Sequence, residues 1–447
     1  MWGAHNTALI EKQGVPAVLV VDQPFVEDVK VTLEKVGMPA VRSVVVPHPC
    51  GDIPDDQYAK YIPKLVAALT APLTEEEKKT GEIVPRKPPR IALSGTLDEV
   101  QSYFLAHHWS DGLPIIPPTE ARVKEMLKGT SHAADEVVTS NMLPEGWTAT
   151  VEKAAIVGVM AGCKPAYMPV LLAMVEAFGK SLFQTNVRST NSFTNMTLVN
   201  GPIRNEIGMN AGINALGPCN QANATIGRFL KMAIINLGGS WPGISDLGSQ
   251  GSPTKYNFCF PENEERSPWE PFHVSLGFKR EESTVSIFYN GLAHFGNFSD
   301  LDHMAKGIKF FDRLASGLRT NGVAILMDPM VAKSLSAKGM SKKDVEDYVW
   351  SHSTLTLGEL KKDIRMFAHD DFKLVLQRKE YDDGVYKQRD GQTYVWPQSY
   401  VDLPDDAIVS SWPRHHIKVI VVGGETNPMA QTWSLGAPSM VGVDKWR

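Results

Sequence analysis

Residues 17–46, AVLVVDQPFVEDVKVTLEKVGMPAVRSVVV, decide the fold class of the first part of the chain. Two short apolar runs in this stretch predict buried strands, and the segment between them has helical spacing and stops at a Gly-Met-Pro turn. Strands are expected at Ala17–Val21 and Val41–Val46, and helices at Thr7–Gln13, Val26–Val36 and Asp56–Leu69. This alternation predicts a small parallel α/β domain over residues 1–72. Because two strands leave exposed edges, we expect a separate polypeptide or a second copy of the chain to complete the sheet.

A larger α/β domain with long polar loops is expected over residues 96–447, after a charged, proline-containing linker at residues 73–95. Its pattern of apolar residues predicts alternating helices and strands. The helices are expected at Leu97–His107, Pro169–Phe178, Ala222–Leu237, Leu301–Leu318 and Lys342–Trp350, and the strands at Thr284–Tyr289, Val323–Met327 and Ile417–Val422.

The composition excludes several classes of protein. The 447 residues include 45 Lys and Arg against 50 Asp and Glu, and this balance argues against a broad nucleic-acid-binding surface. No apolar run approaches the ~20 residues that span a bilayer, so no membrane segment is expected. The first residues lack the features of a secretory signal, and the four cysteines contain no C-x-x-C pair, which together favour a cytoplasmic protein with reduced thiols. Motifs for nucleotide binding and for zinc hydrolases are absent from the sequence, and no cofactor is predicted.

The stretch from Asn186 to Asn223 holds nine asparagines, and its side chains offer uncharged donors and acceptors to a polar ligand. It leads into a helix whose first N–H groups could hold an anion, and two nearby arginines could pair with it. The alternative is an extended turn region that ends in a helix cap. The length of the loop favours a functional role. The expected substrate-binding residues are Asn200, Arg204, Asn220, Asn223 and Arg228.

The acidic segment Pro261–Val274, PENEERSPWEPFHV, supplies the candidates for proton transfer. Neighbouring carboxylates raise one another's pKa, so Glu265, Glu270 and His273 are the expected proton-transfer residues. We expect Glu270 or His273 to line one pocket with Arg204, with Asn220 and Asn223 at the start of the helix that follows the asparagine-rich stretch. Glu270 and His273 have the spacing of a helical metal pair, but Pro271 disfavours the helix and no metal site is predicted. A solvated acidic loop is the alternative.

Two further sites follow predicted strands. Gly423 and Gly424 come directly after the apolar run that ends at Val422, and ligands of open α/β sheets bind at such strand ends. Cys50 follows Val41–Val46, and an imidazolium at His48 would lower the pKa of its thiol, so Cys50 is the candidate nucleophile. Simple strand-to-loop turns and a buried structural cysteine are the alternatives.

Several of these motifs together resemble the UGSC-motif (seleno)protein family, and more distantly the carboxy-terminal part of component B of the glycine, sarcosine and betaine reductases. The resemblance is carried by EKQGVP at residues 11–16, VVVPHPCG at 44–51, DGLPIIPPT at 111–119, MAGCKP at 160–165, NGPIR at 200–204, ANATIGR at 222–228 and ENEERSPWEPFH at 262–273. The family carries a selenocysteine- or cysteine-containing motif ahead of this region, whereas this sequence contains no Cys-Gly-Ser-Cys and has Cys50 where an apolar residue is expected.

The resemblance implies a subunit of a heteromeric enzyme. Its thiol or selenol would lie on a small partner chain, and its reaction would be a reduction or the cleavage of a carbon–heteroatom bond in a small polar or anionic substrate. A non-redox lyase or hydratase that uses only the Glu and His residues is the first alternative. A scaffold subunit that orders a cysteine-bearing partner and has no chemistry of its own is the second.

Overall fold

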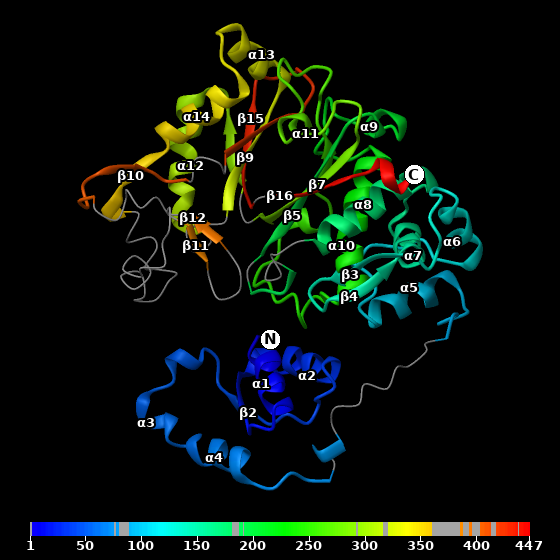
Figure 1. The fold of residues 1–447 in the computed structure, drawn as a ribbon, viewed down its shortest axis with the longest axis vertical. Helices are drawn as coiled ribbons and strands as arrows, with labels where there is room; N and C mark the ends of the chain where they lie inside the picture. Colours follow the sequence, from blue (N-terminus) through cyan, green and yellow to red (C-terminus); the bar gives the residue numbers. More distant parts are fainter. Residues whose placement is uncertain are drawn as a thin grey trace. The chain divides into compact units, whose positions relative to one another are not determined.

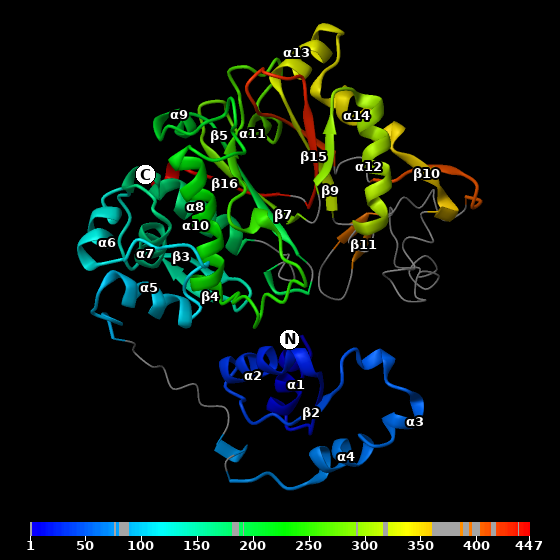
Figure 2. The same ribbon diagram turned by 180° about the vertical axis from the view of Figure 1, so that it is seen from behind.

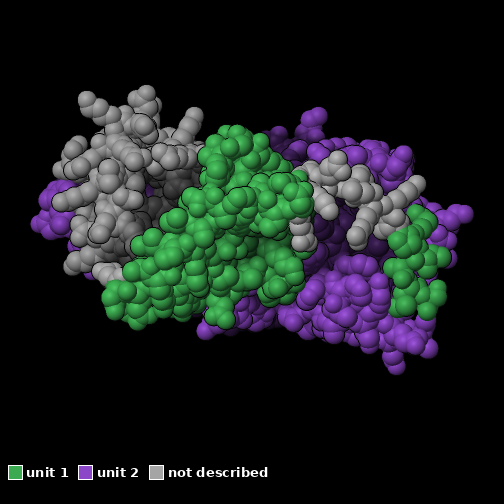
Figure 3. All heavy atoms as spheres, turned by 90° about the horizontal axis from the view of Figure 1, so that it is seen from below, with its two compact units in different colours: residues 1–94, 242–245 green, residues 95–241, 246–447 purple. Residues whose placement is uncertain are grey.

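The computed structural model describes residues 2–75, 77–79, 89–180, 187–190, 192–291, 294–315, 321–359, 385–387, 393–395, 403–412, 417–436 and 438–447. The chain divides into two compact units, which Figure 3 distinguishes by colour. The smaller unit comprises residues 1–94 with 242–245, and the larger unit comprises residues 95–241 with 246–447.

The smaller unit is a parallel α/β arrangement, as the sequence predicted (Figure 1). Its strands pair in parallel from Leu19↔Ser43 to Asp22↔Val46. Its elements are α1 (Trp2–Lys12), β1 (Leu19–Asp22), α2 (Val26–Lys35), β2 (Ser43–Val46), α3 (Asp55–Tyr58) and α4 (Ile62–Thr70). The single helix expected at Asp56–Leu69 is two helices, because Pro63 lies in the first turn of α4, where its missing N–H is tolerated and starts a new helix.

The larger unit contains ten helices in its described residues. They are α5 (Leu97–Ala106), α6 (Glu120–Leu127), α7 (Val151–Ala161), α8 (Met168–Gly179), α9 (Ile203–Glu206), α10 (Gln221–Gly238), α11 (Phe272–Ser275), α12 (Leu301–Ala315), α13 (Pro329–Ala337) and α14 (Lys342–His352). All helices expected from the sequence in this unit are present, although residues 316–318 of the fourth lie outside the described part. No helix in the described ranges has both the length and the apolar character to cross a bilayer.

The strands in the described residues of the larger unit form two four-stranded mixed sheets and three small pairs. The first sheet has the order β16-β7-β5-β6, with β5 (Thr194–Asn200), β6 (Cys259–Pro261), β7 (Thr284–Gly291) and β16 (Pro438–Gly442). The second has the order β14-β9-β15-β8, with β8 (His294–Phe298), β9 (Asn321–Met327), β14 (Ile417–Val421) and β15 (Ala430–Gly436). The pairs are β3 (Val137–Met142) with β4 (Trp147–Thr150), β10 (Thr354–Thr356) with β13 (Ile408–Ser410), and β11 (Val385–Lys387) with β12 (Thr393–Val395).

Three apolar clusters arrange the two large sheets in four layers, helix–sheet–sheet–helix (Figures 1 and 2). Alternate residues of each strand point to opposite faces, and here each face meets a different layer. In β9, Ile325 packs with α12 and α14, whereas Leu326 packs with residues of the first sheet such as Phe288. In β7, Ile287 belongs to the cluster that includes α7, α8 and α10. Helix α8 is buried along its whole length, which explains its almost continuous apolar sequence.

The asparagine-rich stretch is more regular than expected. It contains β5, an inner strand of the first sheet, and the short helix α9. Likewise, the acidic segment begins at the end of β6 and ends in α11. Both segments are therefore anchored to the sheets, because their apolar residues, such as Leu198 and Phe272, belong to the core between the two sheets.

Candidate functional site

A cavity of about 220 Å³ lies where the parallel strands β9 and β14 end, the position at which ligands bind in open α/β sheets. Gly423 and Gly424, the two glycines expected there, both line it. A Cβ atom on Gly424 would lie 2.4 Å from the backbone N and Cα of Ile213, so only glycine fits. Gly423 adopts φ 117° and donates its N–H to Ala211.

The polar lining of this strand-end cavity is almost entirely uncharged. Asp328 supplies the one carboxylate among its lining residues, and Asn214, Asn427, Thr426 and Gln431 supply amides and a hydroxyl. Asp328 caps α13 by accepting the N–H of Met330 at 2.8 Å, and it also accepts the N–H of Glu425 at 2.9 Å. Such a lining suits a small ligand that is rich in hydrogen-bonding groups.

A buried ion-pair cluster lies beside this cavity. It consists of Asn200, Arg204, Glu262, Glu264, Glu265, His273 and Lys342. Asn200 donates to Glu262 at 2.6 Å and to Glu264 at 3.1 Å. The segment that carries these carboxylates is fixed to the cavity wall by Asn263, whose backbone N–H donates to Val421 and whose side chain donates to Gly423. Cluster and cavity therefore share one rigid support.

Arg204 occupies the centre of the cluster and is 3% exposed. Its guanidinium lies 3.1 Å from the Glu264 carboxylate and donates to both oxygens of Glu265, at 3.2 and 3.0 Å. It also donates to the carbonyls of Gly201 and Glu262. These contacts use the groups that were expected to bind a substrate anion, so Arg204 organises the protein's own carboxylates.

His273, one of the residues expected to transfer a proton, lies in the interior of the cluster. It is fully buried, and neither ring nitrogen has a hydrogen-bond partner among the described residues. Its Nδ1 lies 3.9 Å from Glu264, slightly beyond hydrogen-bond distance. Buried polar atoms without a hydrogen-bond partner are uncommon, and such atoms point to a functional role rather than to a contribution to stability. Lys342, which the sequence did not suggest, lies 3.6 Å from Glu262 in the same cluster.

The other two expected acid–base residues lie in environments that differ from that of His273. Burial opposes the ionisation of Glu265, but its hydrogen bonds with Arg204 and Asn205 outweigh this effect and lower its pKa to about 2. The expectation of a raised pKa is wrong for Glu265, because the guanidinium outweighs any repulsion between neighbouring carboxylates. Glu270 is exposed, whereas His273 is fully buried, so the pair does not share one environment. In the described part of the chain, no three His, Cys, Asp or Glu side chains are arranged to hold a metal ion.

The other expected ligand-binding residues serve the structure. Asn220 caps α10 through the N–H of Asn223, and Asn223 makes three further hydrogen bonds to the backbone of the preceding loop. Arg228 forms a two-point ion pair with Asp111, at 2.8 and 2.9 Å. The alternative of turns that end in a helix cap therefore describes Asn220 and Asn223, and Arg228 connects two distant segments of the larger unit.

In the smaller unit, Cys50 belongs to a polar group at the carboxyl ends of β1 and β2. Asp22 accepts the backbone N–H of Cys50 at 3.1 Å and lies 2.9 Å from Nδ1 of His48. The Cys50 thiol is exposed, and its hydrogen bond with Asp22 raises its pKa. The expectation of a lowered pKa is wrong because the nearest charge is a carboxylate rather than an imidazolium. Asp22 could have been found from the sequence, since parallel strands end at the same edge of a sheet.

The fold and this group define an α/β protein whose N-terminal unit presents a thiol beside a carboxylate at a strand end. Residues 2–75 match the model of the UGSC family, the family that the sequence motifs resemble. No curated protein and no solved structure matches the chain.

Proposed function

We propose that the chain is a subunit of an enzyme that acts on a small polar or anionic substrate, with thiol or selenol chemistry shared with a partner chain. The observation that carries the proposal is the meeting of Asp22, His48 and Cys50 in the unit that matches the model of the UGSC family. The reaction class is a reduction or the cleavage of a carbon–heteroatom bond.

The raised pKa of Cys50 decides which part of such chemistry this thiol performs. A thiol that stays protonated near neutral pH is a poor first nucleophile, because the thiolate is the attacking species. Its place in the proposed chemistry is a slower second step, in which the Cys50 sulfur bonds to one sulfur of a disulfide or selenenyl sulfide on the partner chain and the displaced thiolate or selenolate takes up the proton that Cys50 loses. His48, beside the carboxylate of Asp22 that raises the thiol pKa, would keep that carboxylate in position.

The strand-end cavity is the proposed place for the substrate in the larger unit. Its volume, its amide and hydroxyl lining and the carboxylate of Asp328 suit a small molecule that carries an amine or other donor groups. The neighbouring cluster supplies His273 and Glu264 for proton transfer.

A non-redox lyase or hydratase is the second candidate, and the unpartnered imidazole of His273 favours it. A buried imidazole beside a carboxylate can remove a proton from carbon and return it to a leaving group without any thiol. In that case Cys50 would have no part in turnover.

The test uses the chain isolated without oxygen, together with the proteins that copurify with it, and a panel of small carboxylates that carry amino, thio or hydroxyl groups. Turnover is measured with and without a dithiol in the wild type, in Cys50→Ser and in the control Cys163→Ser. The Cys163 thiol donates to the carbonyl of Thr225, and burial raises its pKa to about 12, so it is expected to be inert. We expect dithiol-dependent turnover that is lost only in Cys50→Ser.

Two other outcomes would contradict the proposal. Turnover without a dithiol that survives Cys50→Ser and is lost in His273→Gln would establish the lyase or hydratase. Binding of a panel member without any turnover, in the presence of the copurified partner, would identify a scaffold subunit.

A further inference from the structure

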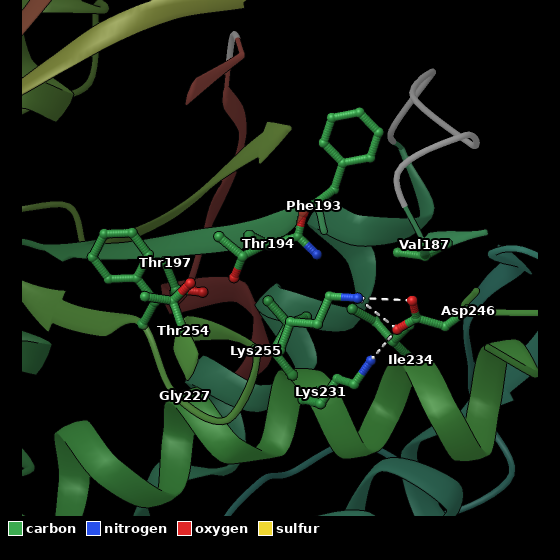
Figure 4. Close-up of a pocket in the computed structure, with 13 residues that line it drawn as sticks. Val187, Phe193, Thr194, Thr197, Gly227, Lys231, Ile234, Asp246, Thr254 and Lys255 are labelled. Carbon is green, nitrogen blue, oxygen red and sulfur yellow. Dashed lines mark hydrogen bonds and ion pairs between the residues drawn. The ribbon is translucent and has the colours of Figure 1, made fainter. Parts of the chain in front are cut away.

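A second cavity in the larger unit contains an arrangement of amines that the proposed thiol chemistry does not use. It lies between α10 and β5 and has a volume of about 30 Å³ (Figure 4). Lys231 reaches into it from α10, and Lys255 reaches into it from the segment before β6. Both ammonium groups point toward Asp246, at 3.0 Å for Lys231 and at 2.7 and 2.9 Å for Lys255.

The walls of this lysine pocket also hold polar atoms without a hydrogen-bond partner among the described residues. Oγ1 of Thr194, a residue that is 5% exposed, and Oδ1 of Asn195 have no hydrogen-bond partner within the described part of the chain. Both residues line the cavity. A cavity of this volume has room for about two water molecules, so the pocket can admit a small polar group to these atoms.

We propose that this pocket is a site at which a short-chain aldehyde or ketone forms an imine with the amine of Lys231. A lysine that is removed from water and lies beside a second cation is the arrangement that makes an amine nucleophilic near neutral pH. The small volume restricts the carbonyl compound to a short chain.

The three charged residues have complementary parts in the reaction. The Lys231 nitrogen bonds to the carbonyl carbon, the π electrons move to oxygen, and the ammonium of Lys255 gives that oxygen a proton. The positively charged nitrogen of the resulting carbinolamine gives one proton to Asp246, and Asp246 passes it to the hydroxyl group. The carbon–oxygen bond then breaks, water leaves, and the nitrogen lone pair forms the carbon–nitrogen double bond. The remaining proton on that nitrogen returns to Lys255. Amine and carbonyl compound thus become imine and water, with no change in oxidation state and no further reactant.

The electrostatics of the pocket favour the neutral amine. Burial lowers the pKa of Lys231, and the charge of Lys255 lowers it further, whereas Asp246 and the more distant Asp111 oppose the shift. Burial also opposes the ionisation of Asp246, but the two lysines outweigh this and lower its pKa, so a proton acceptor is ready. Each unit by which an amine's pKa falls increases its neutral fraction near pH 7 about tenfold.

The test is reductive trapping in the full-length chain. Acetaldehyde and cyanoborohydride are added at pH 7, and peptide mass spectrometry measures the rate at which each lysine gains an ethyl group. We expect Lys231 to be labelled at least ~10-fold faster than the exposed Lys124 of α6, because its neutral fraction is larger. Lys255→Met should slow the labelling of Lys231 by ~10-fold or more, because it removes a proton donor and a neighbouring cation. The control Lys124→Met should leave that rate unchanged.

Labelling of Lys231 no faster than that of Lys124, or an unchanged rate in Lys255→Met, would overturn the proposal. If Lys255→Met does not fold, the ratio of the labelling rates of Lys231 and Lys124 in the wild type tests the proposal by itself. The comparison can be repeated with acetone and with a bulky aldehyde such as benzaldehyde. The small cavity predicts trapping of acetone but not of benzaldehyde, and equal trapping of both would also contradict the site.

Discussion

Replacing Arg204 by methionine should test whether this residue organises the protein or binds a substrate. The change removes the guanidinium but keeps an unbranched side chain in the buried position. Arg204 is 3% exposed and contacts two carboxylates and two backbone carbonyls, so we expect a large loss of stability.

The magnitude follows from the two carboxylates that lose their partner. Glu264 is 7% exposed at its side chain, and breaking a buried ion pair from one side costs about 3–5 kcal/mol. Glu264 keeps its hydrogen bonds from Asn200 and Gly201, which favours the lower end of that range. Glu265 is 56% exposed at its side chain, so its share is no more than about 1 kcal/mol. We therefore expect Arg204→Met to reduce the free energy of unfolding by about 3–4 kcal/mol, and Arg204→Lys by less, since it keeps the charge but loses the planar fork.

Urea unfolding monitored by tryptophan fluorescence measures this effect, because every tryptophan in the described part of the chain except Trp2 lies in the larger unit. The matched control is Arg266→Met, which removes a surface ion pair with Glu425 and should cost no more than about 1 kcal/mol. Adding Glu264→Gln to Arg204→Met should restore part of the lost stability, because the uncompensated charge disappears. Equal stability of Arg204→Met and Arg266→Met would refute the structural role of Arg204.

Three further predictions concern other parts of the structure. Iodoacetamide should label Cys50 at pH 7 more slowly than a free peptide thiol. Asp22→Asn should speed the reaction, because it removes the carboxylate that raises the thiol pKa. An unchanged rate in that variant would show that Asp22 does not set the pKa of the Cys50 thiol. Because the pKa of Glu265 is lowered to about 2, its ion pair should stabilise the larger unit above about pH 4.3, the usual pKa of glutamate, and this contribution should disappear as the pH falls toward 2. The variant Glu265→Gln should lack this part of the pH dependence of unfolding. Identical pH dependence of stability in the wild type and the variant would contradict the prediction. Gly424→Ala should destabilise the larger unit by about 1–3 kcal/mol in urea unfolding, because the new Cβ clashes with the backbone of Ile213. The control Gly212→Ala, whose Cβ would be 3.6 Å from its nearest neighbour, should reduce the free energy of unfolding by less. Equal losses of stability in the two variants would argue against tight packing at this cavity wall.

Local sequence patterns were sufficient to predict the parallel smaller unit and the main helices and strands expected in the larger unit. The strands and helices around Val21, Val29 and Val44 follow from apolar spacing that holds within a few residues. The same local logic located Gly423 and Gly424 at the end of a strand, where they line a cavity. It also found most members of the buried ion-pair cluster, because acidic residues and a histidine crowd into one short segment.

What the sequence could not determine was which charged groups meet. Lys231 and Asp246 look like ordinary polar residues in the sequence, and only the packing of α10 against the loop before β6 places them together in a pocket. The pKa of Glu265 is lowered and the pKa of Cys50 is raised, each opposite to the expectation from the sequence, because the sequence does not show which charges meet. The nearest charge in space was Arg204 in one case and Asp22 in the other, and neither is a close neighbour in sequence. Hydrophobic periodicity is a local property that the chain carries along its length, whereas electrostatic interactions depend on distance and burial, which exist only after the layers have packed.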